Sequence, residues 1–389
     1  MGRQLIWVLL AACGGSRENP HAIAAPLAST STSAGTSTTP STTPRAFREL
    51  AAVKMRVVGK ATAKKLPFHG ASGVTVAPDG KTFFIDASQN GTPGGLVVSD
   101  AHPSGVFFGT SEVHDARFSR DGKKLVVYND ERDVASVLAV PDGGVLRDEM
   151  HVKQARFDGA TLVTWNGCQL ARDGVAFGPK ICGGADGSDD GRTWIVVTPE
   201  RHGRPLSMRT YEELQWIDAR TGVAKSIAHG VGEVRISPKG DFVCAMTPRL
   251  WCFDVARAEA VEMPRIDTYR LSWDDDGSRF VAAPFRFDDL VVVDFAARTY
   301  RHVGIDADFR WLSFVPGGRI AAWDKGAFLI DPATGETVEL FPKTVEVGGL
   351  AVVPGERDRF FMGNEIGSAR DWFEVRVPIA APVSAARQP

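Results

Sequence analysis

The chain repeats one pattern, which is clearest in Val74-Thr-Val-Ala-Pro-Asp-Gly-Lys-Thr-Phe-Phe-Ile85. Two apolar runs flank a Pro-Asp-Gly turn, in which proline fixes φ, aspartate accepts hydrogen bonds from nearby backbone and glycine adopts a positive φ. This combination predicts a β-hairpin between two buried strands. Related segments recur at 116–127, 155–163, 186–197, 234–243, 271–281, 312–321 and 350–361.

The spacing of these hairpins predicts the architecture. They begin about 39 residues apart, which is the length of a four-stranded propeller blade. The interval between 155 and 234 is about twice as long, so the degenerate copy near Asp186 is placed inside it. We therefore predict an all-β β-propeller of four-stranded blades with eight blades, or seven if the copy near Asp186 belongs to its neighbour. The last unit stops after three strands, so the N-terminal run 54–59 is predicted to complete the last blade and remove an exposed edge.

Composition narrows the class of protein. The chain has 389 residues, of which 43% are hydrophobic and 24% charged, as in ordinary globular proteins. Its 40 glycines and 23 prolines fit a fold with many tight turns. The formal net charge of −2 argues against a nucleic-acid-binding protein. We expect the propeller to occupy residues 46–380, followed by a disordered tail at 381–389.

The first 45 residues are predicted to lie outside the folded body. Arg3 precedes a short apolar run at 5–12, which is too short to span a bilayer and reads as a signal peptide over residues 1–13. An uncharged Ser/Thr/Pro-rich stretch at 26–44 cannot form a core. Residues 14–45 are therefore expected to form a disordered tether, with an r.m.s. reach of roughly 30 Å.

The end of the signal segment, Leu10-Ala11-Ala12-Cys13, resembles a bacterial lipobox. The resemblance implies cleavage before Cys13, acyl chains on that residue and stable anchoring in a membrane. The segment could instead be a secretory signal with an incidental cysteine. No aspartate follows Cys13, which by resemblance to Gram-negative lipoproteins favours the outer membrane, with its periplasmic or surface side left open.

The repeats with their Pro-Asp-Gly turns resemble the WD-like propellers of bacterial envelope proteins over residues 50–378, nearly the whole body. The Gly-His and Trp-Asp pairs of eukaryotic WD repeats are not regularly present. Together with the lipobox, the resemblance is to a bacterial lipoprotein that carries a WD-like β-propeller. It implies an architecture and says almost nothing about activity.

Four cysteines remain once Cys13 is set aside. We predict the local disulfides Cys168–Cys182 and Cys244–Cys252, since an envelope compartment is oxidising and the second pair falls on neighbouring strands. The other pairings, and four buried free thiols, remain open.

Polar residues precede many of the predicted first strands, at positions that ring one mouth of a propeller channel. This set is a candidate binding site for an anion, a metal or a polar partner, or else it caps loops. Its members are His69, His114, Asp115, His151, His229, Glu233, Arg270 and Arg310. The insert at 199–211, which is rich in arginine, is predicted on the same face. The tryptophans are expected to pack between blades.

One segment matches the start of a calcium loop, through Asp186, Ser188 and Asp190. Its twelfth position is Val197 rather than an acid, so a plain hairpin turn is the competing interpretation, and no other cofactor is indicated. The sequence contains neither a Gly-x-Ser-x-Gly elbow nor a His-Glu-x-x-His pair.

These observations predict a function in binding. We expect a monomeric envelope propeller, anchored to the membrane by its lipid, that binds a protein or a small polar ligand on one face. Catalysis is not indicated by any single motif. The alternative is a propeller hydrolase or a metal-dependent enzyme with its site at the channel mouth.

Overall fold

The computed structural model describes residues 46–69, 71, 73–89, 92–109, 113, 115–129, 132–199, 211–231, 233–247, 249–266, 268, 270–283, 289–306, 309–366 and 369–378. Four regions that carry predictions lie outside these residues: the signal peptide and tether with Cys13, His114, most of the insert at 199–211, and the tail at 381–389. Within the described part, no helix is long and apolar enough to cross a membrane.

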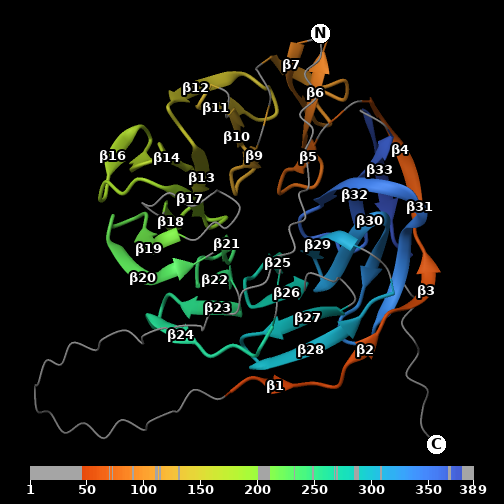
Figure 1. Ribbon diagram of the computed structural model, residues 1–389. Coiled ribbons are helices and arrows are strands. Elements are labelled where there is room, and N and C mark those ends of the chain that lie inside the picture. Colours follow the sequence, from red (N-terminus) through yellow and green to blue (C-terminus); the bar gives the residue numbers. More distant parts are fainter. Residues whose placement is uncertain are drawn as a thin grey trace, which may run out of the picture. The chain divides into compact units, whose positions relative to one another are not determined.

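Antiparallel blades surround a central channel, with their first strands innermost (Figure 1). We call the four strands of a blade A to D, from the channel outward. Blade 1 contains β5 (Gly73–Val76), β6 (Phe83–Gln89), β7 (Thr92–Val98) and β8 (Val106–Gly109). Blade 2 contains β9 (Asp115–Phe118), β10 (Lys124–Asn129), β11 (Val134–Ala139) and β12 (Val145–Met150). Blade 3 contains β13 (Gln154–Asp158), β14 (Thr161–Trp165), β15 (Leu170–Arg172) and β16 (Val175–Phe177).

The ring continues with three further blades of the same order. Blade 4 contains β17 (Gly184–Gly187), β18 (Thr193–Pro199), β19 (Tyr211–Asp218) and β20 (Ala224–Val231). Blade 5 contains β21 (Glu233–Ile236), β22 (Phe242–Thr247), β23 (Arg249–Asp254) and β24 (Glu259–Val261). Blade 6 contains β25 (Arg270–Trp273), β26 (Arg279–Ala283), β27 (Asp289–Asp294) and β28 (Thr299–Gly304). The degenerate copy near Asp186 is thus a blade of its own.

The last two blades share a strand. In blade 7, β29 (Phe309–Val315) pairs with the first part of β30 (Arg319–Ile330), whose second part pairs with the beginning of β31 (Glu336–Val352). In blade 8, the end of β31 pairs with β32 (Arg359–Ile366), then β33 (Ala369–Arg376), then β4 (Thr62–His69). Because β31 runs through both blades, eight blades form only seven separate sheets. The prediction of eight blades is confirmed.

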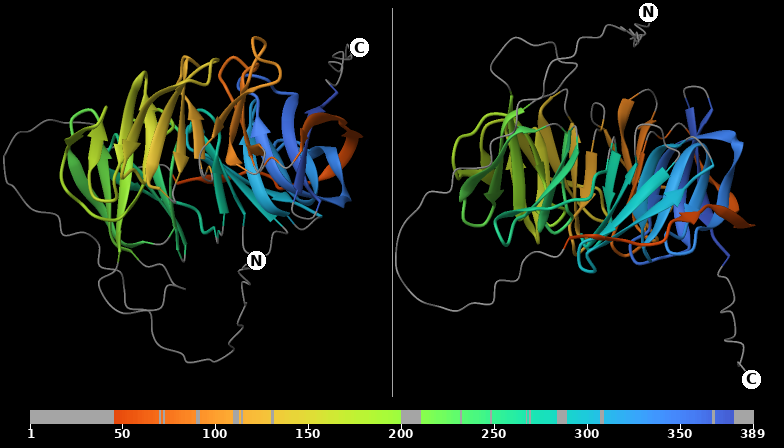
Figure 2. Two further views of the ribbon diagram at one scale, coloured as in Figure 1. Left: turned by 90° about the horizontal axis from the view of Figure 1, so that it is seen from above. Right: turned by 60° about the horizontal axis from the view of Figure 1, so that its bottom comes forward.

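The ring is closed by the N-terminal end of the body, residues 48–69, which we call the N-terminal belt. Strands β1 (Arg48–Glu49) and β2 (Val53–Lys54) lie parallel to β28, and β3 (Arg56–Lys60) lies parallel to β31. Figure 2 shows the belt in orange-red along the outer rim. After β1, β2 and β3, strand β4 completes blade 8 by pairing with β33.

A strand from the N-terminal end therefore completes the last blade, as predicted, but the predicted residues were wrong. The run 54–59 adds an extra edge strand to blade 7, and the following segment, β4, pairs with β33. The reason is that strand D of a blade must run antiparallel to strand C, as β4 does to β33, whereas β3 lies parallel to β31. The belt reaches blade 8 only after passing along the rims of blades 6 and 7.

The core is divided among the spaces between blades. Eight hydrophobic clusters occur among the described residues, one between each pair of adjacent blades. Where blade 8 meets blade 1, Trp372 is 2% exposed and donates from Nε1 to the Ala71 carbonyl at 2.9 Å. Both predicted disulfides are present, Cys168–Cys182 in blade 3 and Cys244–Cys252 between β22 and β23 of blade 5.

This topology gives the propeller two different faces. The turns that join strands A to B and C to D lie on one face, which we call the A–B face. The B–C loops and the connections from one blade to the next lie on the other, the B–C face. In blade 1, Asp79 closes the A–B turn by accepting hydrogen bonds from the Lys81 and Thr82 amides at 2.8 and 2.9 Å, as the Pro-Asp-Gly pattern predicts.

Candidate functional site

The inner strands carry side chains of different chemistry at one equivalent position. In each strand A this position lies two or three residues before the A–B turn. It is occupied around the ring by Thr75, Arg117, Arg156, Asp186, Arg235, Ser272, Ser313 and Ala351. Charged residues therefore stand in blades 2 to 5, whereas small residues stand in blades 6 to 8 and 1. The wall of the channel is polar and asymmetric.

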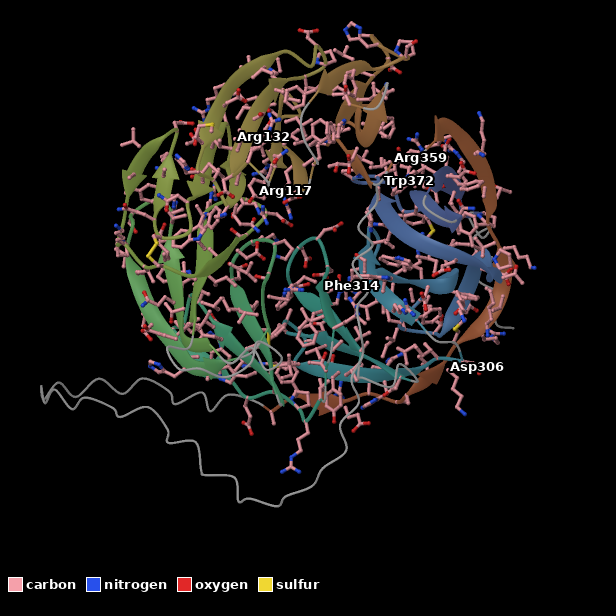
Figure 3. All side chains as sticks on the ribbon, turned by 45° about the horizontal axis from the view of Figure 1, so that its top comes forward. Arg117, Arg132, Asp306, Phe314, Arg359 and Trp372 are labelled. Atoms are coloured by element: carbon pink, nitrogen blue, oxygen red, sulfur yellow. A yellow bond between two sulfur atoms is a disulfide. The ribbon has the colours of Figure 1, made fainter. Side chains whose placement is uncertain are left out.

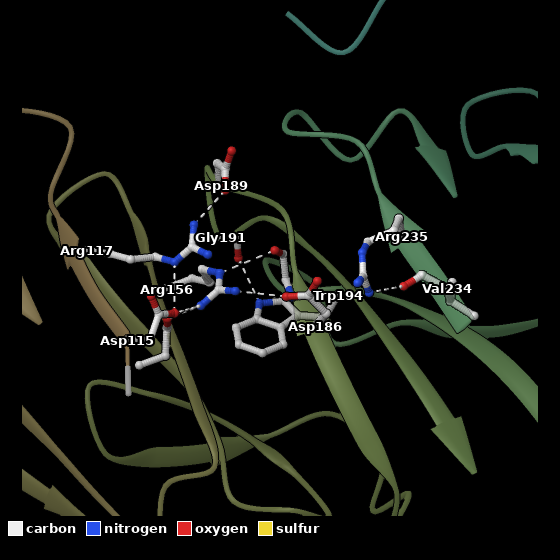
Figure 4. A network of polar contacts seen from close by, with 11 residues as sticks. Asp115, Arg117, Arg156, Asp186, Asp189, Gly191, Trp194, Val234 and Arg235 are labelled. Carbon is white, nitrogen blue, oxygen red and sulfur yellow. Dashed lines mark hydrogen bonds and ion pairs between the residues drawn. The ribbon is translucent and has the colours of Figure 1, made fainter. Parts of the chain in front are cut away.

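Arg156 joins three neighbouring blades at this level (Figure 4). Its guanidinium donates to Asp115 of blade 2 at 3.3 Å and to Asp186 of blade 4 at 2.8 Å. It also donates to the carbonyls of Ala155 and Gly187, at 2.8 and 3.3 Å. The Arg156 side chain is only 4% exposed, so this buried charge is compensated by carboxylates on both sides.

Arg117 extends the network toward the open channel. It donates to Asp115 at 3.1 Å and to Asp189 at 2.8 Å, and its side chain is 38% exposed. Figure 3 places Arg117 at the inner side of the ring. Burial alone would raise the pKa of Asp115, but the Arg117 and Arg156 guanidiniums outweigh it and lower this pKa. The carboxylate is therefore held in its charged form.

The second polar cluster lies where β25 and β29 begin, on the B–C face. The Arg270 guanidinium stacks over the Trp311 ring, 4.1 Å from its centroid. Trp311 is 45% exposed, whereas Trp165, Trp194 and Trp372 are almost completely buried. Next to it, the Arg310 side chain is 70% exposed, with Nε 3.5 Å from the Asp324 carboxylate. We call Arg270, Arg310 and Trp311 the mouth platform.

The structure brings together some of the predicted site residues. Asp115 belongs to the Arg156 network, and Arg270 and Arg310 belong to the mouth platform. Glu233 begins strand A of blade 5, at the position equivalent to Asp115, and its side chain is outside the described set.

The three predicted histidines within the described residues, His69, His151 and His229, lie at or just beyond the outer strands. His69 ends β4 opposite Asp371, and its side chain is not among those described. His151 follows β12 with φ +59° and is exposed, and His229 is exposed on β20 opposite Glu213. The described part of the chain holds no group of three or more His, Cys, Asp or Glu side chains arranged to bind a metal.

The residues of the predicted calcium loop point to different partners. Asp186 accepts from Arg156, while Ser188 donates to Asp190 at 2.6 Å and so closes the A–B turn of blade 4. Calcium binding there stays a prediction.

Sequence reasoning missed Trp311, which we had assigned to packing between blades. A usable signal was present, because Trp311-Leu-Ser-Phe aligns with Arg270-Leu-Ser-Trp. Trp311 thus takes the channel-mouth position that Arg270 holds in blade 6. A register shift between Phe309 and Trp311 in β29 displaces Arg310 by one residue from that position.

Comparison with known proteins establishes the fold class. No family model and no curated protein matches the sequence. Among solved structures, an oligogalacturonate lyase from Vibrio parahaemolyticus has a TM-score of 0.58 at 11% identity, covering 82% of this chain and 97% of the lyase. The C-terminal WD40 domain of Sif2 has a TM-score of 0.55 at 10% identity, covering 83% and 99%. An oligogalacturonate lyase in complex with manganese has a TM-score of 0.56 at 10% identity, covering 82% and 99%. At such low identity these likenesses define the protein as a β-propeller and go no further.

Proposed function

We propose that the protein is a binding module of the cell envelope, held at the outer membrane by a lipid on Cys13. The propeller presents its B–C face to a protein or a small polar ligand. The observation that supports this most directly is the mouth platform, where an exposed indole lies under an arginine at the channel rim. Tryptophan and arginine are the residues most enriched at the centres of binding interfaces.

The platform favours a ligand with a flat apolar surface and an anionic group. The free part of the Trp311 ring offers a stacking surface. The exposed Arg310 guanidinium offers donors for carboxylate or phosphate oxygens, Arg270 adds positive charge beside the ring, and Arg117 lies on the inner wall of the same channel.

Replacement of Trp311 by alanine is expected to weaken ligand binding by about 2 kcal/mol, roughly thirtyfold, as for an aromatic anchor at an interface centre. The full-length protein would be immobilised and used to capture molecules from detergent-solubilised envelopes, and the affinity for the captured molecule would then be measured. Val175→Ala is the control, because Val175 is 71% exposed but lies on the outer strand β16. Equal capture by both variants would remove the mouth platform from the binding site. Elemental analysis of the same protein tests the metal-dependent alternative.

Replacement of Cys13 by serine is expected to abolish incorporation of radiolabelled palmitate and to release the protein from the membrane fraction, because the acyl chains supply the anchor. The measurement is labelling followed by fractionation of cells that express the full chain. Retention of the label in Cys13→Ser would contradict lipidation at this residue.

A further inference from the structure

A pocket of about 500 Å³ opens on the A–B face between blades 5 and 6, opposite the mouth platform. It is enclosed by two turns from each blade. Blade 5 contributes its A–B turn with Lys239 and Asp241 and its C–D turn with Asp254 and Arg257. Blade 6 contributes its A–B turn with Asp276 and its C–D turn with Arg298.

The base of this pocket is aromatic. The rings of Phe242 and Phe295 are stacked, with centroids 4.3 Å apart and planes 21° apart. The Trp273 ring is also stacked with Phe295, with centroids 5.6 Å apart, and the Phe47 ring meets Phe295 edge-on at 5.8 Å. The pocket therefore offers an apolar surface between charged walls.

The A–B turn of blade 5 reverses the charge order found in the turns of blades 1, 2 and 4. Blades 1, 2 and 4 have Asp-Gly-Lys or Asp-Gly-Arg, and the aspartates Asp79, Asp121 and Asp190 accept from the amide two residues later, at 2.8, 3.1 and 3.1 Å. Blade 5 has Lys239-Gly-Asp241 instead. A lysine cannot accept a hydrogen bond, so neither charge serves the turn.

Backbone hydrogen bonds and the Ser237 hydroxyl close this turn, and Ser237 Oγ accepts from the Phe242 amide at 2.9 Å. Among the described residues, no hydrogen bond or ion pair engages the carboxylate of Asp241. Partial burial raises the pKa of Asp241, Lys239 opposes this effect, and the carboxylates of Asp190 and Asp254 add to it. The channel side of the pocket, with Asp241 and Asp276 against Lys239, thus carries excess negative charge.

The outer side of the pocket carries excess positive charge. The Arg298 guanidinium lies 5.0 Å from the Phe47 ring centroid, and no carboxylate of the described residues pairs with it. Arg257 is 65% exposed and contacts Asp254 and Glu259 only at 3.7 and 3.8 Å. The two sides are separated by two strand spacings, about 9–10 Å.

We propose that this pocket binds a short extended peptide of about three residues, whose free ends lie about 10 Å apart. Its ammonium group lies near Asp241 and Asp276, its carboxylate near Arg298 and its apolar side chains on Phe242 and Phe295. This inference is independent of the proposed function, because it concerns the opposite face and none of the residues of the mouth platform.

Calorimetric titration of the full-length protein with the tripeptide Ala-Phe-Ala tests the proposal. N-acetylation or C-amidation of the peptide is expected to weaken binding about tenfold, as for the loss of one charge-assisted contact. Arg298→Gln is expected to weaken binding of the free peptide, so that the free and the C-amidated peptides bind with the same affinity. Asp241→Asn is expected to give the free and the N-acetylated peptides the same affinity.

The matched control is Arg220→Gln, which removes an exposed arginine from the C–D turn of blade 4 and should leave binding unchanged. Equal affinity for the free, acetylated and amidated peptides would overturn the proposal, and so would the absence of binding at millimolar concentration. Arg298 and Asp241 lie in surface turns, so both variants are expected to fold. Circular dichroism of the two variants checks this.

Discussion

Replacement of Arg156 by methionine is expected to lower the free energy of unfolding by about 2–4 kcal/mol. The change removes the guanidinium that joins blades 2, 3 and 4 and leaves Asp115 and Asp186 facing each other without it. Loss of one partner from a fully buried ion pair costs about 3–5 kcal/mol, and the estimate is lower here because Asp115 and Asp186 are 38% and 37% exposed. Urea unfolding of the full-length protein measures the difference.

Arg117→Met is the matched control, because it removes a guanidinium from the same network but one that is 38% exposed. Arg117→Met should lower the free energy of unfolding by less than half as much as Arg156→Met. Equal losses in the two variants would show that burial of Arg156 does not set its contribution.

Wild type and Arg156→Met should also differ in how their stability responds to acid. The pKa of Asp115 is lowered in the folded state, so its contribution to stability is present above the unfolded value near 4 and is lost as the pH falls toward the folded value. The stability gap between wild type and Arg156→Met is therefore expected to narrow below about pH 4. A gap that stays constant down to pH 2 would contradict this assignment.

Internal deletion of residues 46–69 is expected to abolish the folded monomer, whereas deletion of residues 46–60 should leave it intact. The shorter deletion removes β1 to β3, which add edge strands to blades 6 and 7, and with them Phe47, Val53 and Met55, which are only partly buried at the margins of two clusters. The longer one also removes β4, which supplies strand D of blade 8, and Leu66, which packs in the cluster between blades 8 and 1. Size-exclusion chromatography with light scattering and thermal unfolding distinguish the two outcomes.

A peptide that spans residues 61–71 provides the control for this deletion. If β4 acts only by completing the last blade, the peptide should restore folding of the longer deletion by strand addition. A longer deletion that remains a cooperative monomer without the peptide would show that the ring does not need its closing strand.

The repeating hairpins were predictable because their chemistry is local. Pro-Asp-Gly turns need only neighbouring backbone amides, and the turn at Asp79 forms as the residues require. The cysteine pairs were predictable for a similar reason, since Cys244 and Cys252 flank one short hairpin. The course of the belt was not, because parallel pairing of Arg56 with Glu336 depends on a partner strand 280 residues away.

The candidate site was only partly predictable. Asp115 and Arg270 were found from their place before a first strand, but Arg156 was not, because its role depends on carboxylates from the blades on either side. Trp311 was misjudged because exposure depends on what covers a ring, and composition does not show this. The local shift in β29 also hid its equivalence to Arg270.

The belt has a consequence for how this chain matures. Thr62 and Arg376, which lie side by side in blade 8, are 314 residues apart in sequence. A chain that leaves the ribosome with its N-terminus first must keep β4 unpaired until β33 has followed. Closure is thus the last event of folding, and a chain halted anywhere before β33 exposes two open edges to aggregation or proteolysis. Ring closure therefore acts as a test that synthesis of the propeller is complete.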